Sequence, residues 1–403
     1  MYDLMRQRNA ALAAEVTEFT QELVRTPSPS LDEGAVAALV AERMGLLEYD
    51  RVLTDDFGNV VGVLHGREDM PAVLLNAHMD TVPPGDEAAW DTPPHSGLLR
   101  HGLLHGLGSS DCKGGLAAFV YAGALLRQCL LPLRGSVVVA ATVAEELGDS
   151  VGVRQLLRET LPSLGLEAGL AILGDPTDLA LYRGHDGYAQ FDIVVHGSDD
   201  FEVQDAVNAV YGHLRDPSRA AAEFAVEAPC FEPESGQSRG LIRVAQRLTE
   251  SIPAATAVRG LKERVELVAS RVSRVAVAVS VRQTPAELYT HQRALVERRI
   301  GAWHTDPYHP AVLRVRQSLS AGGCEVRDGM WRLPRLGMGT AGQVMTVTFG
   351  VPALGYGPGN EDWCHVPDEC VPVARIHEAV YGAACIAHGL VGVPVCGWTC
   401  DEI

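Results

Sequence analysis

Long hydrophobic runs are missing from this 403-residue sequence. No stretch reaches the roughly 18 consecutive apolar residues that a membrane-spanning helix needs. The N-terminal segment MYDLMRQRNAALAAEV lacks the basic start and apolar run of a secretory signal. The nine cysteines are odd in number and follow no regular spacing, which is typical of reduced thiols in a cytosol. We therefore expect a cytoplasmic protein.

Basic residues are also scarce. The chain has 33 Lys and Arg against 51 Asp and Glu, a net charge of −18. Nucleic acids and anionic membranes are bound by clustered basic side chains, so this balance argues against both as partners. Hydrophobic residues make up 47% and charged residues 21%, which is usual for a folded globular protein. We therefore expect a small-molecule partner, although the acidity itself names no substrate.

The chain is long enough for two domains. In its first half, apolar runs alternate with helical patterns; strands are predicted at 59–64, 72–75, 136–142 and 170–173, and helices at 8–46 (with a turn at 27–29), 114–131 and 151–160. This alternation predicts an α/β sheet covered by helices on both faces.

The pattern of predicted strands and helices changes from about residue 188. Strands are predicted at 191–195 and 274–281, helices at 205–214 and 286–299, and then a strand at 344–355 and a closing helix at 371–388; residues 215–265 show no clear pattern. We therefore predict an α/β fold in two parts. Residues 1–185 and 296–403 form a catalytic domain with a mixed sheet covered by helices. Residues 186–295 form an inserted, smaller α+β domain.

Two motifs place polar side chains where strands end. His78 and Asp80, in LLNAHMDTVPP, follow an apolar run, and ligands bind at such strand ends in open α/β sheets. Their spacing puts both on one face, so that Asp80 can orient a metal-binding His78. Taken alone, a plain surface pair is the simpler interpretation. Asp111, in GLGSSDCKGG, precedes a predicted helix and suits either a carboxylate that bridges two metals or an N-cap.

Three further segments carry carboxylates or histidine. Glu145 and Glu146, in TVAEELGDS, follow a buried strand, where paired carboxylates are costly without a compensating cation. One can bind metal while the other acts as a base; the alternative is an exposed acidic turn. Asp175 ends another strand beside Pro176, and His365 lies in a loop after the turn at 357–359. Each of these last two residues, taken alone, is more often structural.

The combination is more specific than its parts. His78, Asp111, Glu146, Asp175 and His365 supply two imidazoles and three carboxylates, a set that suits two Zn²⁺ ions, or Co²⁺ or Mn²⁺. Two such metals about 3.5–4 Å apart activate a bridging water and polarise a carbonyl. The sequence therefore predicts a two-metal hydrolase.

The order of these motifs resembles the metallopeptidase and deacylase family that includes aminoacylase, acetylornithine deacetylase, succinyl-diaminopimelate desuccinylase and glutamate carboxypeptidase. The resemblance is greatest over 70–185 and 340–375. It implies that His78 and His365 hold different metals, that Asp111 bridges them, and that Glu146 and Asp175 complete the two shells. Asp80 would orient His78, and Glu145 would be the general base. It also implies that the inserted domain is a lid and a homodimerisation surface.

The lid departs from the family pattern. The family has a Gly followed within a few residues by a His that reaches the substrate carbonyl, whereas here His196 precedes Gly197 and no His follows before residue 201. Such an oxyanion helper is worth about 10²–10³ in rate. The Asn found before the later lid strand is not evident in 254–281 either. Arg282 matches the family's arginine, and RGHDGY and GYGPG are closest to the deacetylase and desuccinylase branch. The candidate substrate contacts are Arg282, His196 and the two glycines of the 357–359 turn, Gly357 and Gly359, where backbone can approach a ligand closely.

Three interpretations follow. The first is an enzyme that hydrolyses an N-acyl amino acid or a small peptide-like amide. The second is a binding or scaffold homologue that kept the metals and lost turnover with the lid His, although retention of Glu145 argues against it. The third adds a structural zinc site made of Cys364, Cys370, Cys396 and Cys400, whose spacings are irregular and contain no CxxC; free thiols are the simpler interpretation.

Overall fold

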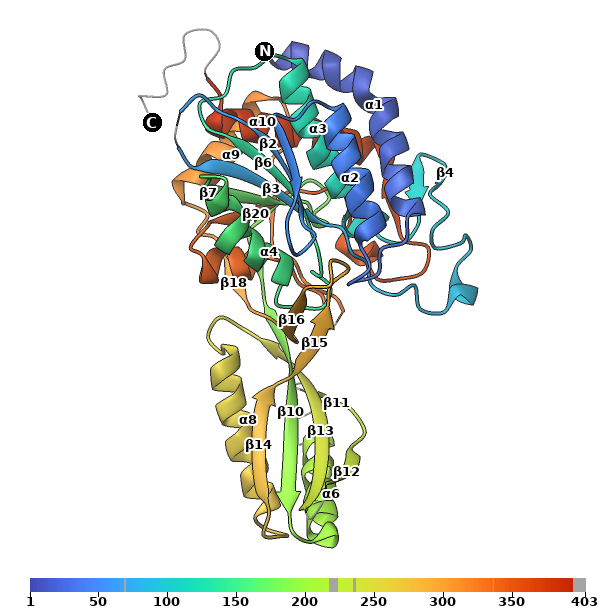
Figure 1. Ribbon diagram of the computed structural model, residues 1–403, viewed down its shortest axis with the longest axis vertical. Coiled ribbons are helices and arrows are strands. Elements are labelled where there is room, and N and C mark those ends of the chain that lie inside the picture. The colour runs from blue at the N-terminus through green and yellow to red at the C-terminus, as the bar shows by residue number, and fades with distance from the viewer. Residues whose placement is uncertain (69, 217–223, 235–236, 336, 394–403) are drawn as a thin grey trace.

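The computed structural model describes residues 1–403 apart from 69, 217–223, 235–236, 336 and 394–403. Figure 1 shows an elongated molecule with a large sheet wrapped by helices at one end. A second sheet with two helices extends away from it. The first and last helices, α1 (Tyr2–Arg25) and α10 (Val373–Val391), both belong to the large-sheet end.

The large sheet is mixed and has the strand order β1-β2-β6-β3-β7-β20-β8-β19. Its strands are β1 (Arg51–Thr54), β2 (Val60–Leu64), β3 (Ala72–His78), β6 (Val137–Thr142), β7 (Ala168–Leu173), β8 (Leu181–Tyr182), β19 (Asp328–Gly329) and β20 (Ala353–Gly355). β3 pairs in parallel with both β6 and β7. The carboxyl ends of these three strands therefore meet at one edge, where three of the predicted ligands lie: His78, Glu146 and Asp175.

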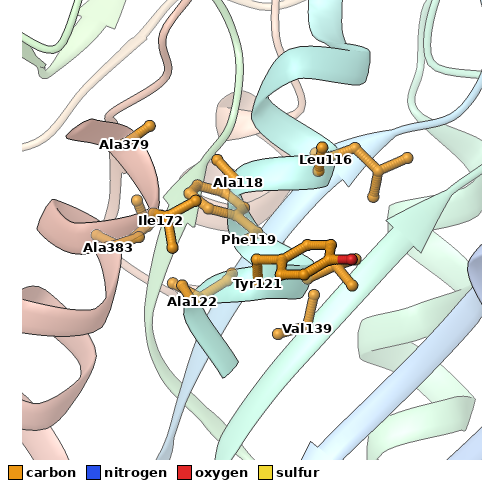
Figure 2. Close-up of a cluster of buried hydrophobic side chains, with 14 of the residues drawn as sticks. Leu116, Ala118, Phe119, Tyr121, Ala122, Val139, Ile172, Ala379 and Ala383 are labelled. Atoms are coloured by element: carbon orange, nitrogen blue, oxygen red, sulfur yellow. The ribbon is translucent and has the colours of Figure 1, made fainter. Parts of the chain in front are cut away.

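Helices cover both faces of this sheet, as predicted. One face packs on α1, α2 (Gly34–Leu46), α3 (Gly114–Gln128), α9 (Pro310–Ala321) and α10. The other packs on α4 (Val151–Gln155), η3 (Leu156–Thr160), α5 (Leu161–Ser163) and η4 (Val344–Thr348). Every residue of α3 from Gly114 to Leu126 is buried, because its small side chains let α10 and the sheet approach closely (Figure 2).

Shorter elements complete the large-sheet end. β4 (Leu98–Arg100), β5 (Leu103–His105) and β21 (Cys370–Pro372) form a small sheet, and β9 (Gly184–His185) pairs with β18 (Trp303–His304). Three single-turn helices, η1 (Glu87–Ala89), η2 (Ser109–Lys113) and η5 (Glu361–Trp363), lie in connecting loops. Among the described residues, no helix combines the length and the apolar character needed to cross a membrane.

The second sheet, here called the lid sheet, has the order β11-β13-β10-β14, with β12 and β17 paired beside it. Its strands are β10 (Gly187–Gly197), β11 (Phe224–Val226), β12 (Cys230–Glu234), β13 (Gln237–Leu248), β14 (Ala276–Val281) and β17 (Arg299–Ile300). Helices α6 (Asp200–Arg215) and α8 (Ala254–Ala269) bury an apolar cluster against one face. The predicted fold class, a helix-covered mixed sheet plus a smaller α+β lid, is confirmed.

Two predicted elements are wrong. Residues 286–299 do not form a helix but a hairpin of β15 (Gln283–Glu287) and β16 (Arg293–Glu297). At its tip the Tyr289 hydroxyl donates to the Gly58 carbonyl (2.9 Å), so contacts with a distant segment override local helix propensity. Residues 344–355 are a strand only at 353–355, because Val344 and Met345 pack as a helical turn into the core on the η4 face.

Candidate metal centre

His78 is the last residue of β3 and is buried. Its Nδ1 lies 2.9 Å from the main-chain carbonyl of Asp80; since a carbonyl only accepts, Nδ1 carries a proton, and Nε2 is the nitrogen whose lone pair is free for a metal once the ring is neutral. Nε2 lies 3.1 Å from Asp111 Oδ1. The ring therefore has the tautomer and direction that a metal ligand needs.

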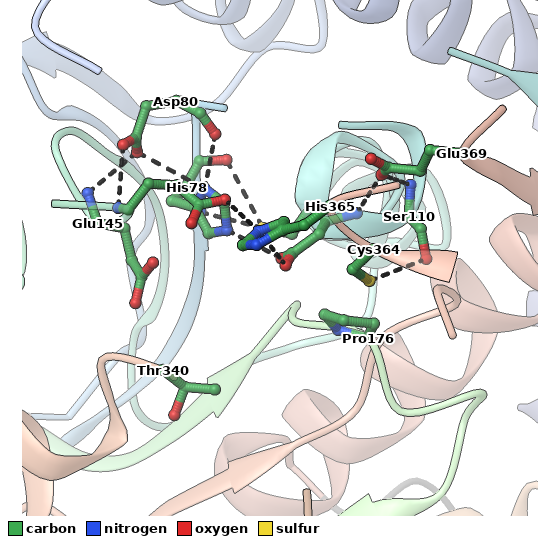
Figure 3. A network of polar contacts seen from close by, with 12 residues as sticks. His78, Asp80, Ser110, Glu145, Pro176, Thr340, Cys364, His365 and Glu369 are labelled. Atoms are coloured by element: carbon green, nitrogen blue, oxygen red, sulfur yellow. Dashed lines mark hydrogen bonds and ion pairs between the residues drawn. The ribbon is translucent and has the colours of Figure 1, made fainter. Parts of the chain in front are cut away.

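Asp80 lies beside His78 with both its main-chain carbonyl and its carboxylate. Its carboxylate lies 3.6 Å from His78 Nδ1, so the hydrogen bond that orients the ring comes from its carbonyl. The carboxylate accepts hydrogen bonds from the backbone N–H groups of Glu145 (3.0 Å) and Glu146 (3.1 Å) and from Ser30 Oγ (2.7 Å) (Figure 3). Asp80 thus fixes both the histidine and the double-glutamate loop.

Asp111 is the central member of the site. It lies in η2, where its peptide bond to Cys112 is cis, and its two oxygens face different histidines. Oδ1 is 3.1 Å from His78 Nε2 and Oδ2 is 3.4 Å from His365 Nε2. The loop is held by Glu369, whose Oε1 accepts from the N–H groups of Ser110 (2.8 Å) and Asp111 (3.0 Å) (Figure 3). Glu369 was missed in the sequence, because nothing local to PDEC indicates that it reaches residues 110 and 111.

His365 and Glu146 form the other half of the site. His365 Nε2 lies 2.9 Å from Glu146 Oε1. His365 has a left-handed backbone (φ 56°), a conformation that costs about 1–3 kcal/mol for a non-glycine residue and clusters at functional sites. Figure 3 shows His78 and His365 close together although they are far apart in the sequence.

Several buried carboxylates with raised pKa values lie close together in this site. Burial, opposed by His78 and reinforced by Asp111, raises the pKa of Asp175 to about 7. Burial also raises the pKa of Glu145 well above its usual range. Burial disfavours a charged His365, but Glu146 and Asp111 outweigh it and raise the pKa of this histidine to about 11. Buried carboxylates in this number require compensating cations, which here are protons or metal ions.

The donor set fits two divalent metals. Ligand atoms gather in two groups, His78–Asp111–Cys112 and Asp111–Glu146–His365, each within 4.8 Å, and Asp111 belongs to both. Burial raises the pKa of Cys112 to about 12, so its thiol stays protonated and accepts a hydrogen bond from the His78 N–H (3.2 Å). Asp175, buried after β7, belongs to neither group, although Asp111 and Glu146 raise its pKa. Imidazole and carboxylate donors with one shared carboxylate suit Zn²⁺ or a similar ion.

Glu145 is the carboxylate left over from these groups. It is buried, and its Oε1 has no hydrogen-bond partner among the residues that the structure describes. Its backbone N–H is held by Asp80, which leaves the side chain directed elsewhere (Figure 3). A buried, unpartnered carboxylate beside metal ligands is what a base for an activated water requires.

A cavity of about 230 Å³ adjoins the site. It is bordered by Glu146 and His365 on the metal side and by Gln190 and Arg298 on the lid side. Arg282 lies behind Gln190, with Nη1 3.1 Å from Gln190 Oε1. Three backbone hydrogen bonds of 2.8–2.9 Å join Gln190, Arg282 and Arg298, here called the arginine seam. Gln190 and Arg298 were missed, since the wrongly predicted helix at 286–299 hid the register that brings them together.

The remaining predicted substrate contacts are not brought to the cavity. His196 lies six residues beyond Gln190 on β10, about 20 Å further along the strand. The turn glycines, Gly357 and Gly359, pack against the loops that carry the metal ligands. A Cβ on Gly357 would overlap the Gly174 carbonyl oxygen, and one on Gly359 would overlap that of Ser110. These glycines allow loops to pack closely.

The cysteine cluster gains no support from the described residues. Cys364 Sγ donates to the Asn360 carbonyl oxygen (3.1 Å), and burial raises the pKa of its thiol well above the usual range. Cys370 is buried in β21. Cys396 and Cys400 lie outside the described residues.

Comparison with known proteins gives consistent results. Residues 74–388 match the family described as Peptidase family M20/M25/M40. The Escherichia coli K12 protein YgeY, described as uncharacterized, is 26% identical over 386 residues, covering 91% of this chain and 92% of YgeY. The Saccharomyces cerevisiae di-peptidase Dug1p has the same fold, with a TM-score of 0.71, 11% identity and coverage of 96% of this chain and 98% of Dug1p. The Bacillus subtilis YXEP protein, a dinuclear metal-binding peptidase, aligns with a TM-score of 0.67 and 12% identity over 95% of this chain and 99% of YXEP.

Proposed function

The chain belongs to peptidase family M20/M25/M40, and from this we propose that it is a two-metal hydrolase cleaving the amide bond of a dipeptide or an N-acyl amino acid with a free carboxylate. One observation carries the proposal. Asp111 faces His78 with one oxygen and His365 with the other, while the buried Glu145 carboxylate stays outside both ligand groups. A bridging ligand and a base are the two parts that hydrolysis by a metal pair needs.

The roles follow from position. His78 and Asp175 would hold one ion, Glu146 and His365 the other, and Asp111 both; Zn²⁺ is our first choice, with Co²⁺ or Mn²⁺ as alternatives. When bound, the ions supply charge that activates water and polarises the substrate carbonyl. Glu145 takes a proton from the attacking water and passes it to the leaving amine. Burial raises its pKa, which suits a group that must both accept and donate near neutral pH.

The arginine seam supports a substrate carboxylate. Burial and the neighbouring Arg282 lower the pKa of Arg298, and within the described part of the chain its guanidinium meets a carbonyl oxygen, that of Leu147 (2.9 Å), but no carboxylate. Arg282 meets Glu227 only at 4.0 Å. The charge of Arg282 therefore acts against that of Arg298, and a bound carboxylate would relieve this repulsion with charge-assisted hydrogen bonds. The small cavity beside them favours short substrates.

The test is a substrate panel with the metal-loaded protein. Dipeptides and N-acetyl, N-succinyl and N-carbamoyl amino acids are assayed with Zn²⁺, Co²⁺ or Mn²⁺, each beside its C-terminal carboxamide. We expect turnover of at least one free acid, a lower kcat/KM for its amide, and about two metal ions per chain by elemental analysis. Arg298→Gln should reduce the ratio of kcat/KM for the free acid to kcat/KM for its carboxamide. Absence of turnover with two ions bound would instead favour the scaffold homologue; in support of it, no histidine of 186–295 borders the cavity among the described residues.

We also propose that residues 186–295 are an inserted lid and a homodimerisation surface, and that the protein is cytoplasmic. The separate apolar cluster of the lid sheet supports the first part. The outer strand β14 alternates exposed and half-buried residues and is paired on one side only, so a second copy has an edge to meet. Native mass spectrometry should give a dimer, and Ala278→Lys, at an exposed position of that strand, should shift the protein towards monomer.

A further inference from the structure

Two cysteines that serve no part of the metal centre meet between α9 and α10. Cys324 follows the turn that ends α9, and Cys385 lies on the buried face of α10, 61 positions later. Cys324 packs against the apolar cluster that contains Cys385, and each thiol changes the pKa of the other. A Cβ at Gly322 would lie 2.8 Å from Cys385 Sγ, so Cys385 sits directly against the turn. Tyr381, one helical turn earlier, donates its hydroxyl to the Gly322 carbonyl (2.8 Å) and fixes the turn to α10.

The two thiols differ in access. Cys324 is half-buried and borders a surface cavity of about 680 Å³ together with Arg6 and Tyr381. Cys385 is 1% exposed. A reagent entering the cavity therefore reaches Cys324, which borders it, before the buried Cys385, which does not. This is the arrangement of an attacking and a resolving thiol.

Their protonation differs in the same sense. The neighbouring Cys385 thiol and the charge of Arg6, opposed by burial, lower the pKa of Cys324. In contrast, burial raises the pKa of Cys112, Cys129, Cys364 and Cys370. The thiolate is the nucleophile in disulfide exchange, so Cys324 is distinguished from these four by both charge and access.

We propose that Cys324 and Cys385 are a modification site, forming a reversible disulfide by exchange with a low-molecular-weight disulfide. The Cys324 thiolate attacks one sulfur of the small disulfide, which forms a mixed disulfide and expels one small thiolate; this thiolate takes up the proton that Cys324 released. Cys385 then loses its proton and attacks the Cys324 sulfur, and the second small thiol leaves. Two protein thiols are oxidised, one small disulfide is reduced to two thiols, and excess thiol reverses the reaction.

The Cys324–Cys385 disulfide would form beside the segment of Tyr356 and Gly357, which packs on a loop of the metal centre. The Tyr356 hydroxyl lies close enough to both thiols for their charge to raise its pKa. Tyr356 borders the same cavity and directly precedes Gly357, which packs on the loop of Asp175. The disulfide would therefore tie α9 to α10 at the back of the metal centre while leaving the ligands untouched.

The experiment uses the full chain with metal bound and oxidised glutathione as probe. Intact-mass analysis of the wild type should show the loss of two hydrogen atoms without retained glutathione, and peptide mapping should give Cys324 joined to Cys385. Cys385→Ser should instead accumulate one glutathione on Cys324. Cys324→Ser should do neither, and circular dichroism should show all three proteins folded.

Cys230→Ser is the matched control, since Cys230 is another half-buried thiol, lying on β12 away from this pair; it should behave as the wild type. Reduced dithiothreitol should restore the original mass. Two results would overturn the proposal: glutathione retained by the wild type with no internal disulfide, or a disulfide that still forms in Cys324→Ser. Failure of the hydrolase assay would not affect it, because it does not rest on turnover.

Discussion

His185 makes the folded protein sensitive to acid in a way that can be calculated. It is buried at the junction between the two sheets. Its Nδ1 donates to the Asp186 carbonyl (2.7 Å), and Nε2 accepts from Trp303 Nε1 (2.9 Å) and the Thr340 N–H (3.0 Å). A proton on Nε2 would face these two donors. Burial lowers the pKa of His185 from 6.5 to about 4.

The direction and size of the change in stability with pH follow from the difference between the pKa of His185 in the folded and unfolded states. Since the pKa is lower in the folded state, the unfolded chain binds more protons between pH 6.5 and 4, and stability is lost as pH falls through that window. The lowering of the pKa from 6.5 to about 4 corresponds to about 3 kcal/mol in the free energy of unfolding, of which about 2 kcal/mol is lost between pH 7 and pH 5.

The assay is urea unfolding of metal-free wild type and His185→Gln at pH 7 and at pH 5, so that metal release does not contribute. The Gln variant keeps an acceptor but cannot take up a proton. We expect it to be less stable at pH 7, and the gap between the two proteins to narrow by about 2 kcal/mol at pH 5. A gap that is the same at both pH values would refute the argument, because His185 would then titrate alike in the folded and unfolded states.

Three further predictions concern the metal centre. Glu145→Gln should lower kcat about 10²–10⁴-fold with metal content unchanged by elemental analysis; retained turnover would contradict its role as the base. Glu369→Gln should weaken metal binding about 10–100-fold in chelator competition, because a neutral acceptor holds the Asp111 loop less firmly; unchanged affinity would remove it as a positioning residue. Gly359→Ala should cost about 1–3 kcal/mol in urea unfolding through overlap with a carbonyl oxygen. Gly212→Ala on α6, with open space around it, is the control and should be neutral or stabilising.

The central strands of the large sheet were predictable because β2, β6 and β7, like most of α3, are almost entirely apolar. Local sequence also marks the strand ends, so the segments carrying His78 and Glu146 could be placed in advance. The hairpin at 283–297 could not be placed. Its residues favour a helix, and what decides its structure is the tip, where Tyr289 and Thr290 donate to carbonyl oxygens of Gly58 and Asp56.

The residues that support the site could not be predicted either, because their contacts are also with segments distant in the sequence. Glu369 is separated from Asp111 by more than 250 positions, and only the fold brings its carboxylate to that backbone. Gln190 and Arg298 meet through strand register, which a single sequence does not encode locally. Whether Asp80 contacts His78 through its carboxylate or its carbonyl depends on the backbone geometry, and in the structure the carbonyl lies 2.9 Å from Nδ1.

The place of the arginine seam has a mechanical consequence. Gln190 and Arg282 lie where the lid strands leave the large-sheet end, and β10 runs from there to the far end of the molecule (Figure 1). If the lid sheet turns about this crossing, side chains near the axis move little and those at the tip, such as His196, sweep a long arc. A carboxylate held at the seam would therefore keep its position in every lid orientation. Binding of the substrate carboxylate would then not depend on the orientation of the lid sheet. Residues in the distal half of the lid sheet could therefore change without loss of substrate affinity.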